Sequence, residues 1–139
     1  FFSLDAASAL VVWAARTFWG LPYYRAAIRI QDAPPDTQYQ CNRGSLAFCA
    51  QAHIGAALPP PPTDSLEYFL CERYQFYATQ RGRLRRARVH HAPYPLQRVE
   101  HATVDSTLLT AAGLPGNGAR IPDLFSPGVD VEVFGLEDA

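Results

Sequence analysis

Glu72 and His91 are the two residues whose types and spacing suggest chemistry most directly. Each lies at one end of a predicted β-hairpin whose turn is Arg81-Gly82. Directly opposed side chains of an antiparallel pair have Cβ atoms about 4.5–5.5 Å apart, so we expect this carboxylate and this imidazole to meet. Such a pair can transfer protons near neutral pH. Two alternatives stay open: a hydrogen bond that only closes the end of the sheet, or a bulge that turns Glu72 outward.

The register of this hairpin follows from its turn. The expected pairs are Gln80–Arg83, Ala78–Arg85, Phe76–Ala87 and Tyr74–Val89, and one step further Glu72–His91. The face that carries these pairs between Tyr74 and Val89 is mostly apolar, so it should face the core. The opposite face carries arginines, glutamine and tyrosine, and it should face solvent.

Several other chemistries are excluded or disfavoured. The chain has no lysine, which excludes Schiff-base, pyridoxal-phosphate and phosphate-loop mechanisms that need an ε-amine. His90, His91, His101 and Cys49 lack standard metal-ligand spacing, so we expect no metal. No serine or cysteine lies in a nucleophile motif of the G-x-S-x-G type, and the glycines at 113–118 enclose a proline and do not form a dinucleotide loop. We therefore expect no cofactor.

Composition and charge indicate one globular domain, spanning residues 1–139. Hydrophobic residues make up 48% of the chain, which supports a core. The net charge of −1 and the pI of about 6.5 predict no general attraction to nucleic acid or to anionic membranes. The arginines between 81 and 98 are expected to form a solvated face that acids of the C-terminal tail balance.

Compartment and membrane expectations follow from short patterns. The apolar stretch at 6–19 is shorter than the ~20 residues that span a bilayer, so we predict no membrane span. Cys41, Cys49 and Cys71 form an odd set without C-x-x-C spacing, which favours buried thiols in a reducing compartment, the cytoplasm. Because the chain contains no methionine, we expect further residues to precede Phe1 in the complete protein.

The elements that must position these residues are mostly strands. Asp5 is predicted to cap a helix over Ala6–Trp19 that Gly20 ends. The predicted strands are Leu21–Ile30, Thr37–Arg43, Ser45–Ile54, the hairpin Tyr74–Thr79 and Leu84–His91, Leu96–Val104 and Val129–Val133, with short helices at Ser65–Cys71 and Ser106–Ala112, a stiff Pro59–Pro62 connector and a loop over Leu114–Gly128. Tight turns between strands imply antiparallel pairing. We predict a mainly β (α+β) fold: a curved antiparallel sheet or partial β-barrel with peripheral helices.

Several ordered motifs resemble one family. They are Phe2-Ser3-Leu4-Asp5-Ala6, Leu21-Pro22-Tyr23-Tyr24, Ser65 to Tyr74, His91-Ala92-Pro93-Tyr94-Pro95-Leu96-Gln97 and Phe125 to Val131. Together they resemble the YqjF-like family of unknown function, grouped by fold with acetoacetate decarboxylase; Tyr94 stands where that family commonly has tryptophan. The resemblance implies an acetoacetate decarboxylase-like barrel of which this chain is the C-terminal portion. The superfamily's enzymes use a Schiff-base lysine, and no residue here can take that role.

The expected function is small-molecule binding in an apolar pocket. Glu72 and His91 would form its polar end as catalytic residues, with Tyr24 and Tyr74 lining it as ligand-binding residues. An enzyme of this kind would transfer protons on a small carbonyl or carboxylic compound without a Schiff-base lysine. The competing hypotheses are a non-catalytic ligand-binding or sensor domain, and a structural fragment that needs a missing segment to fold. The expected partner is a small organic ligand, and homo-oligomer formation is possible in principle.

Overall fold

The computed structural model of the protein describes residues 4–113 and 123–139. Its elements are β1 (Leu4–Ala6), α1 (Ala9–Trp19), β2 (Tyr23–Arg25), β3 (Ala27–Ala33), β4 (Asp36–Arg43), β5 (Leu46–Ala57), α2 (Leu66–Cys71), β6 (Gln75–Gln80), β7 (Arg83–His91), β8 (Gln97–Ser106), α3 (Leu108–Ala111), β9 (Leu124–Phe125), β10 (Val131–Val133) and β11 (Glu137–Asp138). The predicted mainly β fold with peripheral helices is confirmed. None of the helices in the described part of the chain is long and apolar enough to cross a membrane.

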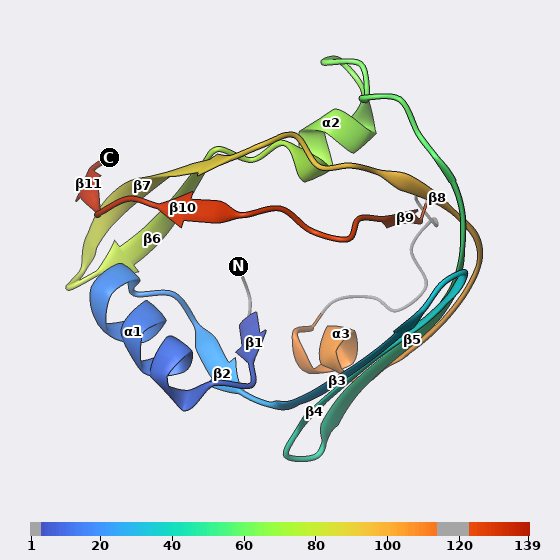
Figure 1. Ribbon diagram of the computed structural model, residues 1–139. Helices are drawn as coiled ribbons and strands as arrows, with labels where there is room; N and C mark the ends of the chain where they lie inside the picture. The colour runs from blue at the N-terminus through green and yellow to red at the C-terminus, as the bar shows by residue number, and fades with distance from the viewer. Residues whose placement is uncertain (1–3, 114–122) are drawn as a thin grey trace.

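A five-stranded antiparallel sheet, in the order β3-β4-β5-β8-β9, forms the larger wall. It curls strongly, so that the chain describes an open ring or half-barrel (Figure 1). Cross-strand pairs place Ile30, Tyr39, Ala50 and Val104 in one row. Cross-strand neighbours share a face of the sheet, so this row forms an apolar face.

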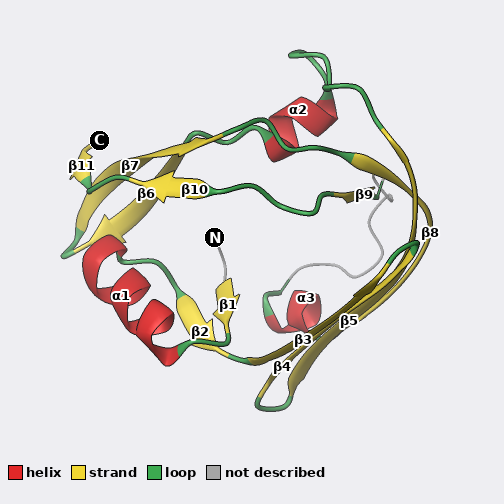
Figure 2. Cartoon of the chain, viewed as in Figure 1, coloured by secondary structure: helices red, strands yellow, loops and turns green. Residues whose placement is uncertain are grey.

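The apolar face of this sheet is the inner one. Strand β1 lies inside the ring (Figure 2), and its Asp5 contacts Cys41 and Arg43. These two residues lie two and four positions after Tyr39 on β4, so they share its face of the sheet. This inner face stays widely open, because Ile30 is 63% exposed and Val104 is 51% exposed. The chain exposes 9810 Å² in total, against about 7200 Å² for a compact monomer of this mass.

The smaller wall contains the predicted hairpin. Strand β7 pairs antiparallel with β6, β10 and β11. The β6–β7 register has Gln80 opposite Arg83, Ala78 opposite Arg85 and Phe76 opposite Ala87, as predicted. The turn residues Arg81 and Gly82 both have positive φ, of 51° and 75°, as a tight hairpin turn requires. Ala87 and Ala78 are buried, so the apolar face of the hairpin points inward as expected.

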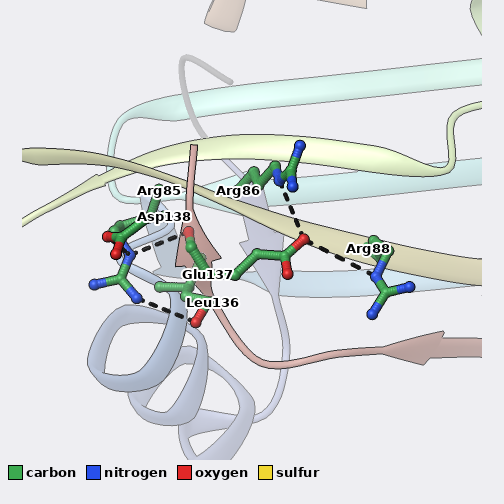
Figure 3. Close-up of polar contacts among 6 residues, drawn as sticks. All are labelled: Arg85, Arg86, Arg88, Leu136, Glu137 and Asp138. Carbon is green, nitrogen blue, oxygen red and sulfur yellow. Dashed lines mark hydrogen bonds and ion pairs between the residues drawn. The ribbon is translucent and has the colours of Figure 1, made fainter.

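Arg85, Arg86 and Arg88 of β7 form ion pairs with acids at the end of the chain (Figure 3). Arg86 lies 3.1 Å from a Glu137 carboxylate oxygen and Arg85 lies 3.4 Å from an Asp138 carboxylate oxygen. Arg88 reaches the same Glu137 oxygen at 4.0 Å. Glu137 and Asp138 of the tail therefore balance arginines of the segment between 81 and 98, as the sequence predicted.

The N-terminal segment differs from the prediction. Asp5 does not cap the first helix, because Leu4–Ala6 forms strand β1, which pairs in parallel with β2. The cap is Ser8, whose hydroxyl accepts a hydrogen bond from the Val11 N–H. The strand predicted over Leu21–Ile30 is divided into β2 and β3, which flank the buried Ala26. The loop predicted over Leu114–Gly128 lies partly outside the described residues and contains β9.

Gly20 fixes α1 against β6, which makes it a test of this packing. It has φ of +63°, and a Cβ there would lie 3.0 Å from the Thr79 carbonyl oxygen. Gly44 has a similar φ of +59° with nothing within 4 Å of the same added atom. We expect Gly20→Ala to lower the free energy of unfolding by about 1–3 kcal/mol, and by more than Gly44→Ala, in urea denaturation. Equal losses in the two variants would contradict the close approach of α1 to β6.

Candidate functional site

Glu72 lies where α2 gives way to β6. Ser65 caps the start of α2 by accepting from the Tyr68 N–H at 3.1 Å, and Glu72 is the residue at its C-terminal end. Its side chain is buried at 8% exposure. One carboxylate oxygen accepts a hydrogen bond from the Tyr74 hydroxyl, and the other accepts from the Tyr94 N–H at 3.2 Å. The carboxylate is therefore held by two donors from within the chain.

His91 lies at the end of β7 and is buried at 6% exposure. Its Nδ1 lies 2.8 Å from the Ala92 carbonyl oxygen and its Nε2 lies 3.4 Å from the Arg73 carbonyl oxygen. Its ring stacks on Tyr74, with centroids 4.6 Å apart, and is tilted against Tyr94 at 4.9 Å. Carbonyl oxygens only accept hydrogen bonds, so both ring nitrogens donate only in the imidazolium form.

The structure brings Glu72, His91 and Tyr74 into one group, which we call the polar cluster together with Tyr94. Glu72 and His91 both contact Tyr74 and Tyr94. Among the residues that the structure describes, no hydrogen bond or ion pair joins the Glu72 carboxylate to the His91 imidazole. The direct contact expected from the hairpin register is therefore replaced by contacts through the two tyrosines.

The reason is the end of the β6–β7 ladder. Its last pair is Gln75 with Arg88, and one further hydrogen bond runs from the Val89 N–H to the Tyr74 carbonyl at 2.9 Å. Glu72 precedes the ladder and belongs to the C-terminal end of α2, whereas His91 pairs with Val131 of β10.

The phenol of Tyr74 and the thiol of the neighbouring Cys71 both have raised pKa values, which disfavours their use as nucleophiles or bases. The hydrogen bond to Glu72, together with burial and the Glu72 charge, raises the pKa of Tyr74 to about 12. Burial, followed by the charges of Glu72 and Glu67, raises the pKa of the nearby Cys71 thiol. A phenol and a thiol with raised pKa values stay protonated near neutral pH, so Tyr74 acts as a hydrogen-bond donor and Cys71 is a poor nucleophile.

A cleft of about 540 Å³ adjoins the cluster, between α1 and the sheet of β6, β7 and β10. Its lining is mainly apolar and comprises Leu4, Val11, Ala14, Ala15, Trp19, Leu21, Tyr23, Phe76, Val89, Val131 and Val133, with Arg73, Gln75 and Tyr94 as polar members. Tyr94 and Arg73 are the residues through which it touches the cluster, since they contact Glu72 and His91. The Trp19 Nε1–H donates to the carbonyl of Phe134, the residue after β10, at 3.0 Å and so joins α1 to the C-terminal segment.

Tyr24 lies apart from the cluster. Leu4 and Tyr23, which pair across β1 and β2, both line the cleft. The next pair along the two strands is Asp5 with Tyr24, and neither of these residues lines the cleft. The Arg43 guanidinium lies 4.4 Å from the centroid of the Tyr24 ring. Neither Tyr24 nor Tyr74 is among the residues that line the cleft.

The sequence reasoning missed a second polar group, on the inner face. The Asp5 carboxylate accepts from Arg43 at 3.0 Å and from the Cys41 thiol at 3.6 Å. Burial, and then the charge of Asp5, raises the pKa of Cys41, and burial likewise raises the pKa of Tyr39. The two-residue spacing of Tyr39, Cys41 and Arg43 places them on one face of β4, but Asp5 reaches them only because Leu4–Ala6 forms a strand in place of the predicted helix cap.

A shallow polar groove crosses the five-stranded sheet. His53 lies there with its Nδ1 2.9 Å from an Asp36 oxygen and its Nε2 3.8 Å from a Glu100 oxygen, and it pairs across strands with His101. Within the described ranges, no three His, Cys, Asp or Glu side chains converge as ligands for a metal ion.

Comparison with known proteins shows the family. Residues 1–130 match the family DUF2071, described as uncharacterized conserved protein. The chain is 38% identical over 117 residues to the uncharacterized protein YqjF of Bacillus subtilis, a match that covers 82% of this chain and 48% of that relative. The chain thus spans about half the length of the curated relative that it matches. No solved structure matches it. The chain belongs to the DUF2071 family of uncharacterized conserved proteins, in which it resembles YqjF.

Proposed function

We propose that this chain forms part of a small-molecule-binding barrel domain, whose ligand is an organic molecule bound in the cleft between α1 and the β6–β7–β10 sheet. The observation that supports it is the cleft itself: about 540 Å³, with mainly apolar walls and a few polar groups at one end. Small-molecule sites have this combination of volume, apolar lining and few orienting polar groups.

The geometry favours the non-catalytic form of this function over a proton-transfer enzyme. Both oxygens of Glu72 already accept hydrogen bonds, and both nitrogens of His91 face backbone carbonyls. A general acid or base must reach the proton of its substrate, directly or through one water molecule. The polar cluster therefore has a supporting role in this proposal, because Glu72 and His91 hold the backbone of Tyr94 and Arg73, which line the cleft. A Glu72→Gln variant that keeps its affinity for the ligand but no longer converts the ligand would reverse the preference for a non-catalytic function.

The grouping with acetoacetate decarboxylase stays a proposal about the fold. The strongly curled antiparallel sheet supports it (Figure 1). The chain contains no lysine, so it supplies no Schiff-base amine to a ligand in this cleft.

Trp19 reports directly on the cleft, because it is one of two tryptophans and lines the wall of α1. In a Trp13→Phe background, we expect 1-octanol to change the fluorescence of Trp19 in a saturable way. Ala14→Phe places a ring in the cleft and should weaken this binding at least about tenfold, equivalent to ~1.4 kcal/mol.

The matched control is Ala9→Phe, the same exchange at an exposed position of α1 that does not line the cleft. It should leave octanol binding unchanged. A response that never saturates, or one that Ala14→Phe and Ala9→Phe affect equally, would rule out binding in this cleft.

A further inference from the structure

The cleft has one charged residue in its described lining. Among the described residues that line it, Arg73 is the charged one, and no aspartate or glutamate accompanies it. A positive charge beside an apolar cleft selects ligands that bring a negative charge with them.

Arg73 also has no acidic partner among the described residues. The ion pairs that arginines form with described residues use Arg43, Arg85, Arg86 and Arg88, and none includes Arg73. Its neighbour Glu72 is not available to it, because the Glu72 carboxylate accepts from Tyr74 and Tyr94. The charge of Arg73 is therefore left for another group to balance.

The guanidinium of Arg73 is held in position before any ligand arrives. It lies over the ring of Phe69 in α2, with its central carbon 3.6 Å from the ring centroid. Stacking on an aromatic face fixes the plane of the guanidinium, and a fixed plane loses less freedom when it binds a carboxylate through two hydrogen bonds.

We infer that the ligand of the cleft is an amphiphilic monocarboxylate, whose carboxylate pairs with Arg73 and whose apolar body lies against Val11, Phe76 and Val133. This inference rests on the proposed function, since it names the class of molecule that the same cleft takes. Arg73 is a specificity-determining residue in this account, while the apolar walls supply most of the contact area.

Calorimetric titration with three probes of equal chain length tests the inference: octanoate, 1-octanol and octylamine. We expect octanoate to bind at least about tenfold more tightly than octanol, as a charge-assisted pair allows, and octylamine to bind most weakly. Arg73→Gln should weaken octanoate binding more than octanol binding and so remove the preference for octanoate. Phe69→Leu should reduce the preference, because the guanidinium loses its support.

Arg25→Gln is the matched control. Arg25 is exposed on β2 and does not line the cleft, so its removal changes the net charge equally without touching the site. Equal binding of octanoate and octanol, or equal losses in Arg73→Gln and Arg25→Gln, would overturn the carboxylate inference while the cleft remained a binding site. Binding of none of the three probes would overturn the proposed function together with this inference.

Discussion

Glu72→Leu is expected to lower the free energy of unfolding by about 1–3 kcal/mol, because the Tyr74 hydroxyl and the Tyr94 N–H lose their acceptor. The carboxylate of Glu72 accepts from the Tyr74 hydroxyl and from the Tyr94 N–H, and the side chain is 8% exposed. Leucine has similar bulk but accepts no hydrogen bond. Urea denaturation followed by circular dichroism measures the loss.

Two further variants serve as comparisons for Glu72→Leu. Glu72→Gln keeps one acceptor oxygen, so we expect a loss of about 1 kcal/mol. Glu132→Leu makes the same exchange at an exposed position of β10 and should change stability by less than about 0.5 kcal/mol. If Glu72→Leu were no more destabilising than Glu132→Leu, the polar cluster would not hold α2 to the sheet.

Tyr74 should be among the last tyrosines of the chain to lose its proton. Its pKa is raised from 10.0 to about 12, first by the hydrogen bond to Glu72. The folded state therefore keeps this proton at pH values where the unfolded chain releases it. The resulting stabilisation is complete below about pH 10 and is lost as the pH rises towards 12.

Ultraviolet absorbance of tyrosinate during a pH titration measures this directly. We expect Tyr74→Phe to remove a step near pH 12, and Glu72→Gln to move that step towards 10. The stability of Tyr74→Phe should also depend less on pH between these values. Loss of a step near pH 10 in Tyr74→Phe would show that the phenol is not bound to the carboxylate.

The hairpin could be predicted from sequence because its determinants are local. A Gly at the turn and the two-residue alternation of the strands fix the β6–β7 register, including Phe76 opposite Ala87. The same rule failed one step beyond the ladder. Glu72 belongs to the end of α2, and β10 is the strand that pairs with His91, so the two side chains meet the same tyrosines without meeting each other.

The cleft could not be predicted, because distant segments form it. Trp19 of α1 bonds to Phe134, 115 residues away, and Val133 of β10 pairs with Val89 of β7. Local periodicity contains no information on such contacts. The error at Asp5 has a different cause: Asp5 and Ser8 both suit a helix cap, and only the pairing of β1 with β2 shows which residue serves.

The inner face of the half-barrel is the competing location for a ligand. Ile30 and Val104 are exposed there, and a second apolar hollow of about 510 Å³ lies between them and Phe125. This hollow adjoins neither Arg73 nor Tyr94. Determining where the bound ligand lies therefore distinguishes the two sites more directly than measuring its affinity.

Isotope-edited nuclear Overhauser measurements on the protein with bound octanoate are that test. We expect contacts from the octanoate methyl and methylene protons to Val11, Phe76 and Val133, which line the cleft between α1 and the sheet. Contacts to Ile30, Tyr39 and Val104 in their place would put the ligand on the inner face and rule out the cleft between α1 and the sheet as its site.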